Sequence, residues 1–269
     1  MLDLRGDRTL LAGCGGYADA RLKSDLIFDL GFHTGQDTEF YLKKGFRVVA
    51  VEANPALVEA GRVRFKRAIA DKRLVLINKG VARMSTAMTF FVNNRNAAWS
   101  SFVEEIGSRG GDFEKISIET TTLKELLAEF GMPYYLKIDI EGYDDIAVAE
   151  LQTVKDRPKY VSLENGYPRT LDLLVSMGFD RFKYVDQSAV AEQRLPFPAR
   201  EGRFALHRFK YESSGAFGEE APGAWLTRNE VLQDIEAYWA TPGLDASIHG
   251  WRDLHARVSD DYSARRSGQ

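Results

Sequence analysis

The chain has few of the residues from which several kinds of protein site are built. Cys14 is the only cysteine among 269 residues, which excludes an internal disulfide and a zinc site made of cysteines. The four histidines are scattered, and no two have the helical i, i+4 spacing of paired metal ligands. The net charge of −3 gives no basic excess, so we expect a small-molecule substrate and no nucleic-acid partner.

Long hydrophobic runs are missing as well. No apolar run reaches the roughly 18 residues of a candidate membrane span, and residues 1–7 lack the basic and apolar segments of a secretion signal. These absences, together with the single cysteine, predict an unexported protein of the reducing cytoplasm with no membrane partner. The 44% of hydrophobic residues is nevertheless enough for a sizeable core.

What the chain does have is a regular alternation of two kinds of segment from Leu26 to Phe209. Short apolar runs predict strands at 26–30, 47–52, 73–78, 87–92, 134–140, 159–164 and 203–210. Apolar residues at helical spacing predict helices at 35–44, 55–69, 121–130, 143–153 and 168–177. The alternation predicts an α/β fold with a doubly wound, Rossmann-like, mostly parallel sheet covered by helices on both faces.

The predicted domain organisation has three parts. Residues 1–24 are a weakly patterned lead, whose Gly13-Cys14-Gly15-Gly16 does not open a βαβ unit, and residues 25–210 form the main domain. Residues 211–269 are a loop and a helical extension packed on the same domain, with helices expected near 227–240 and 250–258. The long loops at 186–202 and 211–226 are candidates for covering a substrate.

The strongest motif runs from Leu26 through a glycine turn to a second strand that ends in an acid. Asp29 closes the first strand, and Gly31 and Gly35 follow it without the G-x-G-x-x-G spacing that admits a pyrophosphate. Glu52 closes the second strand at the distance where an acid binds both hydroxyls of a ribose. A ligand with a ribose and an ammonium but no phosphate fits this pattern, and S-adenosylmethionine is such a ligand.

A second motif, Leu136-Lys-Ile-Asp-Ile-Glu-Gly142, ends a later strand beside the first. Carboxyl ends of parallel strands meet at one edge of a sheet, so Asp139 and Glu141 are expected to face the ligand crevice. With the first motif and Thr122-Leu-Lys-Glu-Leu-Leu127, this element makes the chain resemble the FkbM-type family of class I S-adenosylmethionine-dependent methyltransferases.

The resemblance implies roles for individual residues. Asp29, Gly31 and Gly35 would line the methionine part of the cofactor, Glu52 would hold its ribose, and Asp139 would lie near the sulfonium methyl. Residues 78–81 would border the adenine. The full set of predicted cofactor contacts is Asp29, Gly31, His33, Thr34, Gly35, Glu52, Ala53, Asn54, Gly80, Val81, Ser101 and Asp139.

The resemblance also implies methyl transfer to an oxygen, often a hydroxyl of a sugar or polyketide. Asp139, Glu141 and His33 are the predicted catalytic residues, since each can accept the proton that the hydroxyl loses. His33 stands where many methyltransferases have glycine, and an ordinary loop role for it stays open, as does helix capping for Glu141. We expect no metal, although Asp139, Glu164 and Asn165 offer an alternative oxygen-ligand set of the catechol-methyltransferase kind.

Two other functions remain open from the sequence. A nicotinamide-dependent dehydrogenase shares the acid after the second strand but needs the dinucleotide glycine spacing. A non-catalytic protein that binds S-adenosylmethionine would keep the crevice without using a substrate. The acceptor's identity and the oligomeric state are not encoded in any pattern recognised in the sequence.

Overall fold

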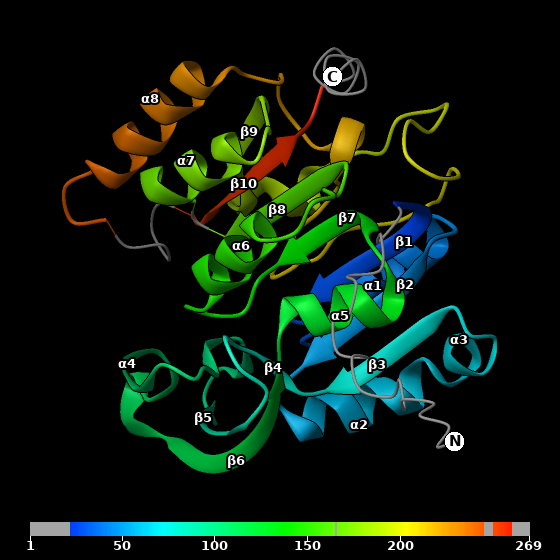
Figure 1. The fold of residues 1–269 in the computed structure, drawn as a ribbon, viewed down its shortest axis with the longest axis vertical. Helices are drawn as coiled ribbons and strands as arrows, with labels where there is room; N and C mark the ends of the chain where they lie inside the picture. The colour runs from blue at the N-terminus through cyan, green and yellow to red at the C-terminus, as the bar shows by residue number, and fades with distance from the viewer. Residues whose placement is uncertain (1–21, 165, 245–249, 260–269) are drawn as a thin grey trace, which may run out of the picture.

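The computed structural model describes residues 22–164, 166–244 and 250–259, and its centre is a sheet of seven strands (Figure 1). Their order is β3-β2-β1-β7-β8-β10-β9. The first five in that order are mutually parallel, which confirms the predicted Rossmann-like α/β class. The strands are β1 (Lys23–Leu30), β2 (Arg47–Glu52), β3 (Leu74–Asn78), β7 (Pro133–Ile138), β8 (Tyr160–Glu164), β9 (Arg181–Asp186) and β10 (Arg252–Arg257).

The last strand, β10, corrects the prediction of a helix near 250–258. It inserts between β8 and β9 and is antiparallel to both. Asp253 and His255 are buried on one face, while Leu254 and Ala256 are buried on the other. Polar and apolar residues alternate over 253–258 with the period of two of a strand, and the helix prediction overlooked this signal. The segment beyond residue 210 therefore contributes a strand to the main sheet.

Helices cover one face of this sheet and pack on the larger apolar core (Figure 1). They are α5 (Leu123–Phe130), α6 (Asp144–Gln152), α7 (Pro168–Ser176) and α8 (Arg228–Trp239), close to their predicted positions. Side chains such as Phe28, Leu136 and Leu254 point from the strands into this core. Thr122 and Glu125 form a capping box that starts α5, since each side chain accepts from the other residue's backbone N–H.

The opposite face packs against α1 (Gln36–Lys43), α2 (Pro55–Arg64), α3 (Lys66–Ala70) and the long irregular segment 193–226, here called the strap. The strap corrects the predicted strand at 203–210, because it has no strand there and only the short η4 (Gly218–Glu220). Phe217 of the strap stacks on Tyr135 of β7 with 4.5 Å between ring centroids. Apolar side chains of the strap thus serve as core, while its last residue, Leu226, pairs with Phe182 of β9 in an isolated bridge.

Buried side chains take the place of sheet hydrogen bonds in the strap. Lys44, just after α1, forms an ion pair with Glu220, and neither side chain is exposed to solvent. Glu220 Oε1 also accepts hydrogen bonds from the backbone nitrogens of Arg200 and Glu201, at 2.9 and 3.2 Å. Paired charges and satisfied backbone groups allow an irregular segment to be buried.

A smaller sheet lies beyond the main one and was only partly predicted. It has the order β4-β6-β5, with β4 (Gly80–Val81), β5 (Ala87–Asn93) and β6 (Phe113–Thr121). Figure 1 shows β5 and β6 beside the end of the main sheet where β3 leads into β4. The sequence analysis missed β6, although Ile116 and Ile118 alternate with polar residues as in a half-buried strand.

The connection between β5 and β6 contains η1 (Ala97–Trp99), α4 (Glu104–Gly107) and η2 (Arg109–Gly111). A further short helix, η3 (Gln187–Glu192), connects β9 to the strap. In the part of the chain that the structure describes, none of the helices has both the length and the apolar character needed to cross a bilayer.

Candidate active site

The turn between β1 and α1 passes too close to the end of β7 for any residue but glycine at its start. Gly31 has a φ of +90°, and a Cβ on it would lie 1.7 Å from the carbonyl oxygen of Asp139. Gly35 has a φ of +76°, and its Cβ would lie 2.5 Å from the ring of Phe32. The two glycines of the motif thus allow the turn to fold over the edge of the sheet.

Glu52, at the end of β2, is held by the backbone on both sides. Its Oε2 accepts from the backbone nitrogen of His33 and its Oε1 from that of Asn54, both at 2.8 Å. Burial raises the pKa of Glu52. Each carboxylate oxygen has a second lone pair, so both oxygens can still accept a hydrogen bond from a ligand diol.

Lys137 forms the centre of a buried charge cluster that sequence reasoning missed. Its Nζ lies 3.3 Å from Asp29 Oδ1, 3.6 Å from Asp37 Oδ2 and 3.2 Å from Asp139 Oδ2. It also donates to the carbonyl of Gly31, at 3.1 Å. Pairing the two predicted strands in register would have indicated this cluster, because Asp29 and Lys137 are direct partners on β1 and β7.

The charges of this cluster are unequal. Burial alone would lower the pKa of Lys137, but Asp139, Asp29 and Asp37 together raise it well above its ordinary value. Burial raises the pKa of Asp37 to about 6. One ammonium therefore faces three carboxylates, and the surplus of negative charge favours a cationic ligand and repels a diphosphate.

A pocket of about 830 Å³, counting the part open to solvent, lies at the carboxyl ends of β1, β2 and β7. Nine of the residues predicted from the sequence line it: Gly31, His33, Thr34, Glu52, Ala53, Gly80, Val81, Asp139 and Glu141. Four predicted residues do not line it, namely Asp29, Gly35, Asn54 and Ser101. The sequence motifs therefore locate the pocket, although not all of their residues reach it.

The four residues behind the pocket support those that line it. Asp29 is 1% exposed, and its Oδ2 accepts from Thr38 Oγ1 at 2.6 Å. Asn54 caps α2 by accepting from the backbone nitrogen of Ala56. Ser101 Oγ donates to the carbonyl of Glu141 at 2.6 Å, which ties the β5–β6 connection to the loop after β7. A direct cofactor contact by any of these four residues stays a prediction.

The far end of the pocket is apolar and narrow. A Cβ on Gly80 would lie 2.2 Å from the ring of Phe102, so the ring packs directly on the backbone of β4. Phe90, Phe102, Val81 and Leu57 line this end together with Lys79. Asn78 fixes the turn after β2 by donating to the carbonyls of Glu52 and Ala53, at 3.0 and 3.1 Å. Such a slot suits a flat aromatic ring.

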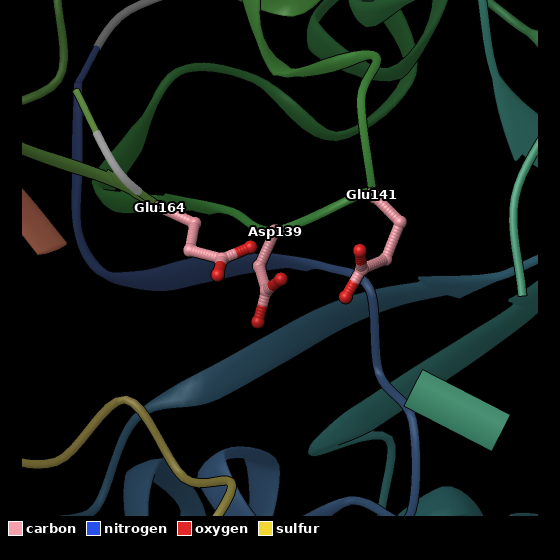
Figure 2. Close-up of side chains that lie close together, drawn as sticks. All are labelled: Asp139, Glu141 and Glu164. Atoms are coloured by element: carbon pink, nitrogen blue, oxygen red, sulfur yellow. The ribbon is translucent and has the colours of Figure 1, made fainter. Parts of the chain in front are cut away.

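Three carboxylates meet at the ends of β7 and β8, and two of them, Asp139 and Glu141, line the pocket. Figure 2 shows Asp139, Glu141 and Glu164 with their carboxylates turned toward the same space, and their oxygens lie within 4.8 Å of one another. Burial raises the pKa of Glu164 to about 8 and the pKa of Glu141 well above its ordinary value, and neighbouring carboxylates add to both shifts. A bound proton or a cation relieves the repulsion in such a trio.

The trio differs from the oxygen-ligand set considered from the sequence. Glu141 stands beside Asp139 and Glu164, whereas Asn165 lies outside the described residues. Glu141 has a φ of +46°, a conformation that turns its side chain back toward the end of β7. The sequence predicted the pair at 139 and 141, but it did not indicate that the loop would bend to face Glu164.

The strap supplies the last side of the pocket. Gln36 Nε2 donates to the carbonyl of Tyr211 at 3.4 Å, and Asp37 accepts from the backbone nitrogen of Ser214 at 3.0 Å. Between these two tethers, Glu212 lines the pocket near His33. Burial lowers the pKa of His33, while the carboxylates of Glu212 and Asp139 act in the opposite direction. Part of the 211–226 segment therefore lies at the pocket, as its length suggested.

The parallel sheet with an antiparallel β10, the acids that end β1 and β2, and the carboxylate-rich crevice define a class I S-adenosylmethionine-dependent methyltransferase. A family model described as "Methyltransferase FkbM domain" matches residues 29–181, which is more than half of the chain. The chain belongs to this family, and S-adenosylmethionine is its cofactor. A search of curated proteins gave no match.

Among the solved structures that the chain matches are three enzymes. A precorrin-6y C5,15-methyltransferase from Geobacter metallireducens is 11% identical, with 90% of this chain and 83% of that chain covered and a TM-score of 0.38. A precorrin-8w decarboxylase from Methanobacterium thermoautotrophicum is 16% identical over 61% and 69%, with a TM-score of 0.33. A geranyl diphosphate methyltransferase in complex with SAM is 10% identical over 88% and 79%, with a TM-score of 0.35.

Proposed function

We propose that the protein methylates a hydroxyl oxygen of a small-molecule acceptor of the sugar or polyketide type. The observation that carries the proposal is the carboxylate trio of Asp139, Glu141 and Glu164, of which Asp139 and Glu141 line the cofactor pocket and Glu164 lies beside them. Carboxylates accept hydrogen bonds from hydroxyl groups, and one whose pKa lies near neutrality can also remove a proton.

The cofactor supplies an electrophilic methyl group on a sulfonium sulfur. In the proposed reaction a C–O bond forms as the C–S bond breaks, and the hydroxyl proton passes to a carboxylate of the trio. Glu164 is the preferred proton acceptor, because burial raises its pKa to about 8, which is within the range of a base working near neutral pH. Asp139 is held by Lys137 and would orient the acceptor, while His33 is a second candidate base.

The residues around the pocket fit the proposed cofactor placement. Glu52 would bind the ribose hydroxyls, the slot beside Phe102 would hold the adenine, and the Lys137 cluster would attract the ammonium. The same charges disfavour the alternative of a nicotinamide-dependent dehydrogenase, since a diphosphate would meet Asp37 and Asp139. A non-catalytic binding protein remains the second alternative, and it predicts cofactor binding without any product.

A screen of hydroxylated acceptors tests the proposal directly. Incubation with S-adenosylmethionine should give a product heavier by one methylene unit, and the site of methylation should be an oxygen. Fragmentation by mass spectrometry identifies that atom. Transfer to nitrogen or carbon, or binding of the cofactor with no product from any acceptor, would contradict the proposed function.

The pH dependence of the rate should follow the protonation of the carboxylate trio. With cofactor saturating, we expect kcat to rise between about pH 6 and about pH 9, because Glu164 must lose its proton before it can act as a base. The midpoint should lie near the raised pKa of about 8 and should vanish in Glu164→Gln.

Asp145→Asn, a change of an exposed carboxylate on α6, is the matched control and should leave the profile unchanged. A profile that is flat in the wild type would argue against a carboxylate base. If chelation abolishes activity and Mg²⁺ restores it, the trio instead holds a cation.

Replacement of Glu212 tests whether the strap contributes to the acceptor side of the pocket. In Glu212→Gln we expect an increase in the acceptor KM of about tenfold and little change in the affinity for S-adenosylhomocysteine. The pKa of His33 should also fall, because the carboxylate that raises it has been removed. Steady-state kinetics and the chemical shifts of His33 measure the two effects, and Glu192→Gln serves as a control.

A further inference from the structure

The outer edge of the strap exposes three large apolar side chains. Phe197 is 82% exposed, Leu206 is 87% exposed and Phe204 is 42% exposed. The rings of Phe197 and Phe204 are in edge contact, with 5.3 Å between their centroids. Single exposed apolar residues need no explanation, but a group of large ones on a single segment indicates a contact surface.

A basic groove adjoins this edge, away from the cofactor pocket. Its floor is apolar, formed by Leu42, Phe65 and Ala68, and Glu39 is its acidic residue. Its cations come from α1, α2, α3, the turn before β3 and the strap, and they are Lys43, Arg64, Arg67, Arg73 and Arg203. Even with Glu39 and with Asp71, which pairs with Arg67 at 3.8 Å, the groove keeps a positive surplus on a chain whose net charge is −3.

Two contacts join the apolar edge to the groove. Arg203 Nε donates to the carbonyl of Lys43 at 2.9 Å, and His207 Nδ1 lies 3.5 Å from Lys43 Nζ. Phe204 and Leu206 lie between these two positions in the sequence. The apolar edge and the basic groove are therefore one continuous surface, here called the basic–apolar face.

Structural roles account for part of the hydrogen-bonding capacity of these arginines. Arg64 donates to the carbonyl of Thr34 at 2.6 Å and pairs with Glu39, and Arg73 donates to the carbonyl of Leu42 at 3.5 Å. The contact with Thr34 lies just before α1, and the contact of Arg73 with Leu42 places a cation at the C-terminal end of that helix, where it is stabilising. A guanidinium has five N–H donors, so each arginine keeps donors for an outside anion. The side chain of Arg67 is 94% exposed.

We infer that the basic–apolar face docks the protein on an anionic lipid bilayer. The arginines would donate to phosphate groups of the lipid, while Phe197 and Leu206 would enter the boundary of the acyl chains. Docking of this kind needs no spanning helix, and the inference does not depend on the chemistry of methyl transfer. The composition gave no sign of it, because the fold assembles the face from separate segments of an acidic chain.

Flotation with lipid vesicles tests this inference on the full chain. We expect binding to vesicles of phosphatidylcholine with phosphatidylglycerol at about 0.1 M salt, and no binding to phosphatidylcholine alone. Arg67→Gln with Arg73→Gln should weaken binding about thirtyfold, which is about fivefold for each charge. Phe197→Ser with Leu206→Ser should weaken vesicle binding at least about tenfold, and the binding that remains should still decrease as salt is added.

A matched control lies on the turn between β4 and β5. Arg83→Gln with Met84→Ser also removes an exposed arginine and an exposed apolar side chain, and it should bind like the wild type. Binding of S-adenosylhomocysteine should be unchanged in every variant, which shows that each one is folded.

Three results would overturn the inference. One is no flotation of the wild type with anionic vesicles, and another is equal binding by all variants. The third is release of the protein from the vesicles by glycerol phosphate, together with unweakened vesicle binding by Phe197→Ser with Leu206→Ser. The groove would then be a site for a soluble phosphate. If that variant instead turns a dimer into a monomer and no vesicles bind, the face is an interface between copies of the chain.

Discussion

Replacing Lys137 with methionine should lower the free energy of unfolding by about 3–5 kcal/mol near pH 8, because three carboxylates then lose their shared cation in a buried site. The methionine fills the same space, so the loss reports charge and not a cavity. Binding of S-adenosylhomocysteine should weaken as well, since Lys137 also holds the carbonyl of Gly31 and the carboxylate of Asp139. Urea denaturation and calorimetric titration measure the two effects.

The pH dependence of the free energy of unfolding shows whether the charge cluster causes the loss of stability in Lys137→Met. Burial already raises the pKa of Asp37 to about 6, and removal of Lys137 should raise it further, because the Lys137 ammonium acts to lower it. The folded variant then binds more protons than its unfolded chain above about pH 4, so its stability decreases as pH rises toward the new pKa. Acidification to about pH 5.5 should therefore restore part of the lost stability.

Lys124→Met is the control for this effect, because Lys124 is exposed on α5 and forms none of the ion pairs of this cluster. It should change the free energy of unfolding by no more than about 0.5 kcal/mol. An equal loss for Lys137→Met at both pH values would mean that packing, and not the charge cluster, accounts for the destabilisation.

The parts of the site that could be predicted are those that follow from local pattern. Parallel strands end at one edge of a sheet, so the acids that end β1, β2 and β7 were expected to gather there, and Glu52 and Asp139 do line the pocket. Asp29 shows the limit of this reasoning. Its strand position was correct, but Thr38 and Lys137 surround its carboxylate, and it lies behind the pocket wall.

The parts that could not be predicted depend on contacts between distant segments. The Asp139–Glu164 approach requires β8 to lie beside β7, and Glu212 reaches the pocket only because the strap is tethered to Gln36 and Asp37. The strap itself read as loop and strand, since its burial comes from side-chain hydrogen bonds that leave no periodic pattern. β10 was wrongly predicted as a helix although 253–258 alternates polar and apolar residues, and only its place between β8 and β9 explains why Asp253 and His255 are buried.

Replacing Glu52 with alanine should weaken S-adenosylhomocysteine binding by about 100-fold or more. Each carboxylate oxygen would lose one charge-assisted hydrogen bond to the ribose, and such bonds contribute about 1.5–3 kcal/mol each. The backbone nitrogens of His33 and Asn54 would lose their acceptor as well. Calorimetric titration of the wild type and variant with S-adenosylhomocysteine, and separately with NAD, measures the change.

Two variants separate recognition of the ribose from general damage to the pocket. Glu52→Gln keeps the shape and one acceptor oxygen, so its affinity should fall between those of the wild type and Glu52→Ala. Glu59→Ala removes an exposed carboxylate from α2 and should bind normally. Binding of NAD alone would contradict the charge argument, since a diphosphate would then be accepted beside Asp37 and Asp139. Unchanged binding in Glu52→Ala would place the ribose elsewhere and leave Glu52 as a residue that only fixes the turn at His33.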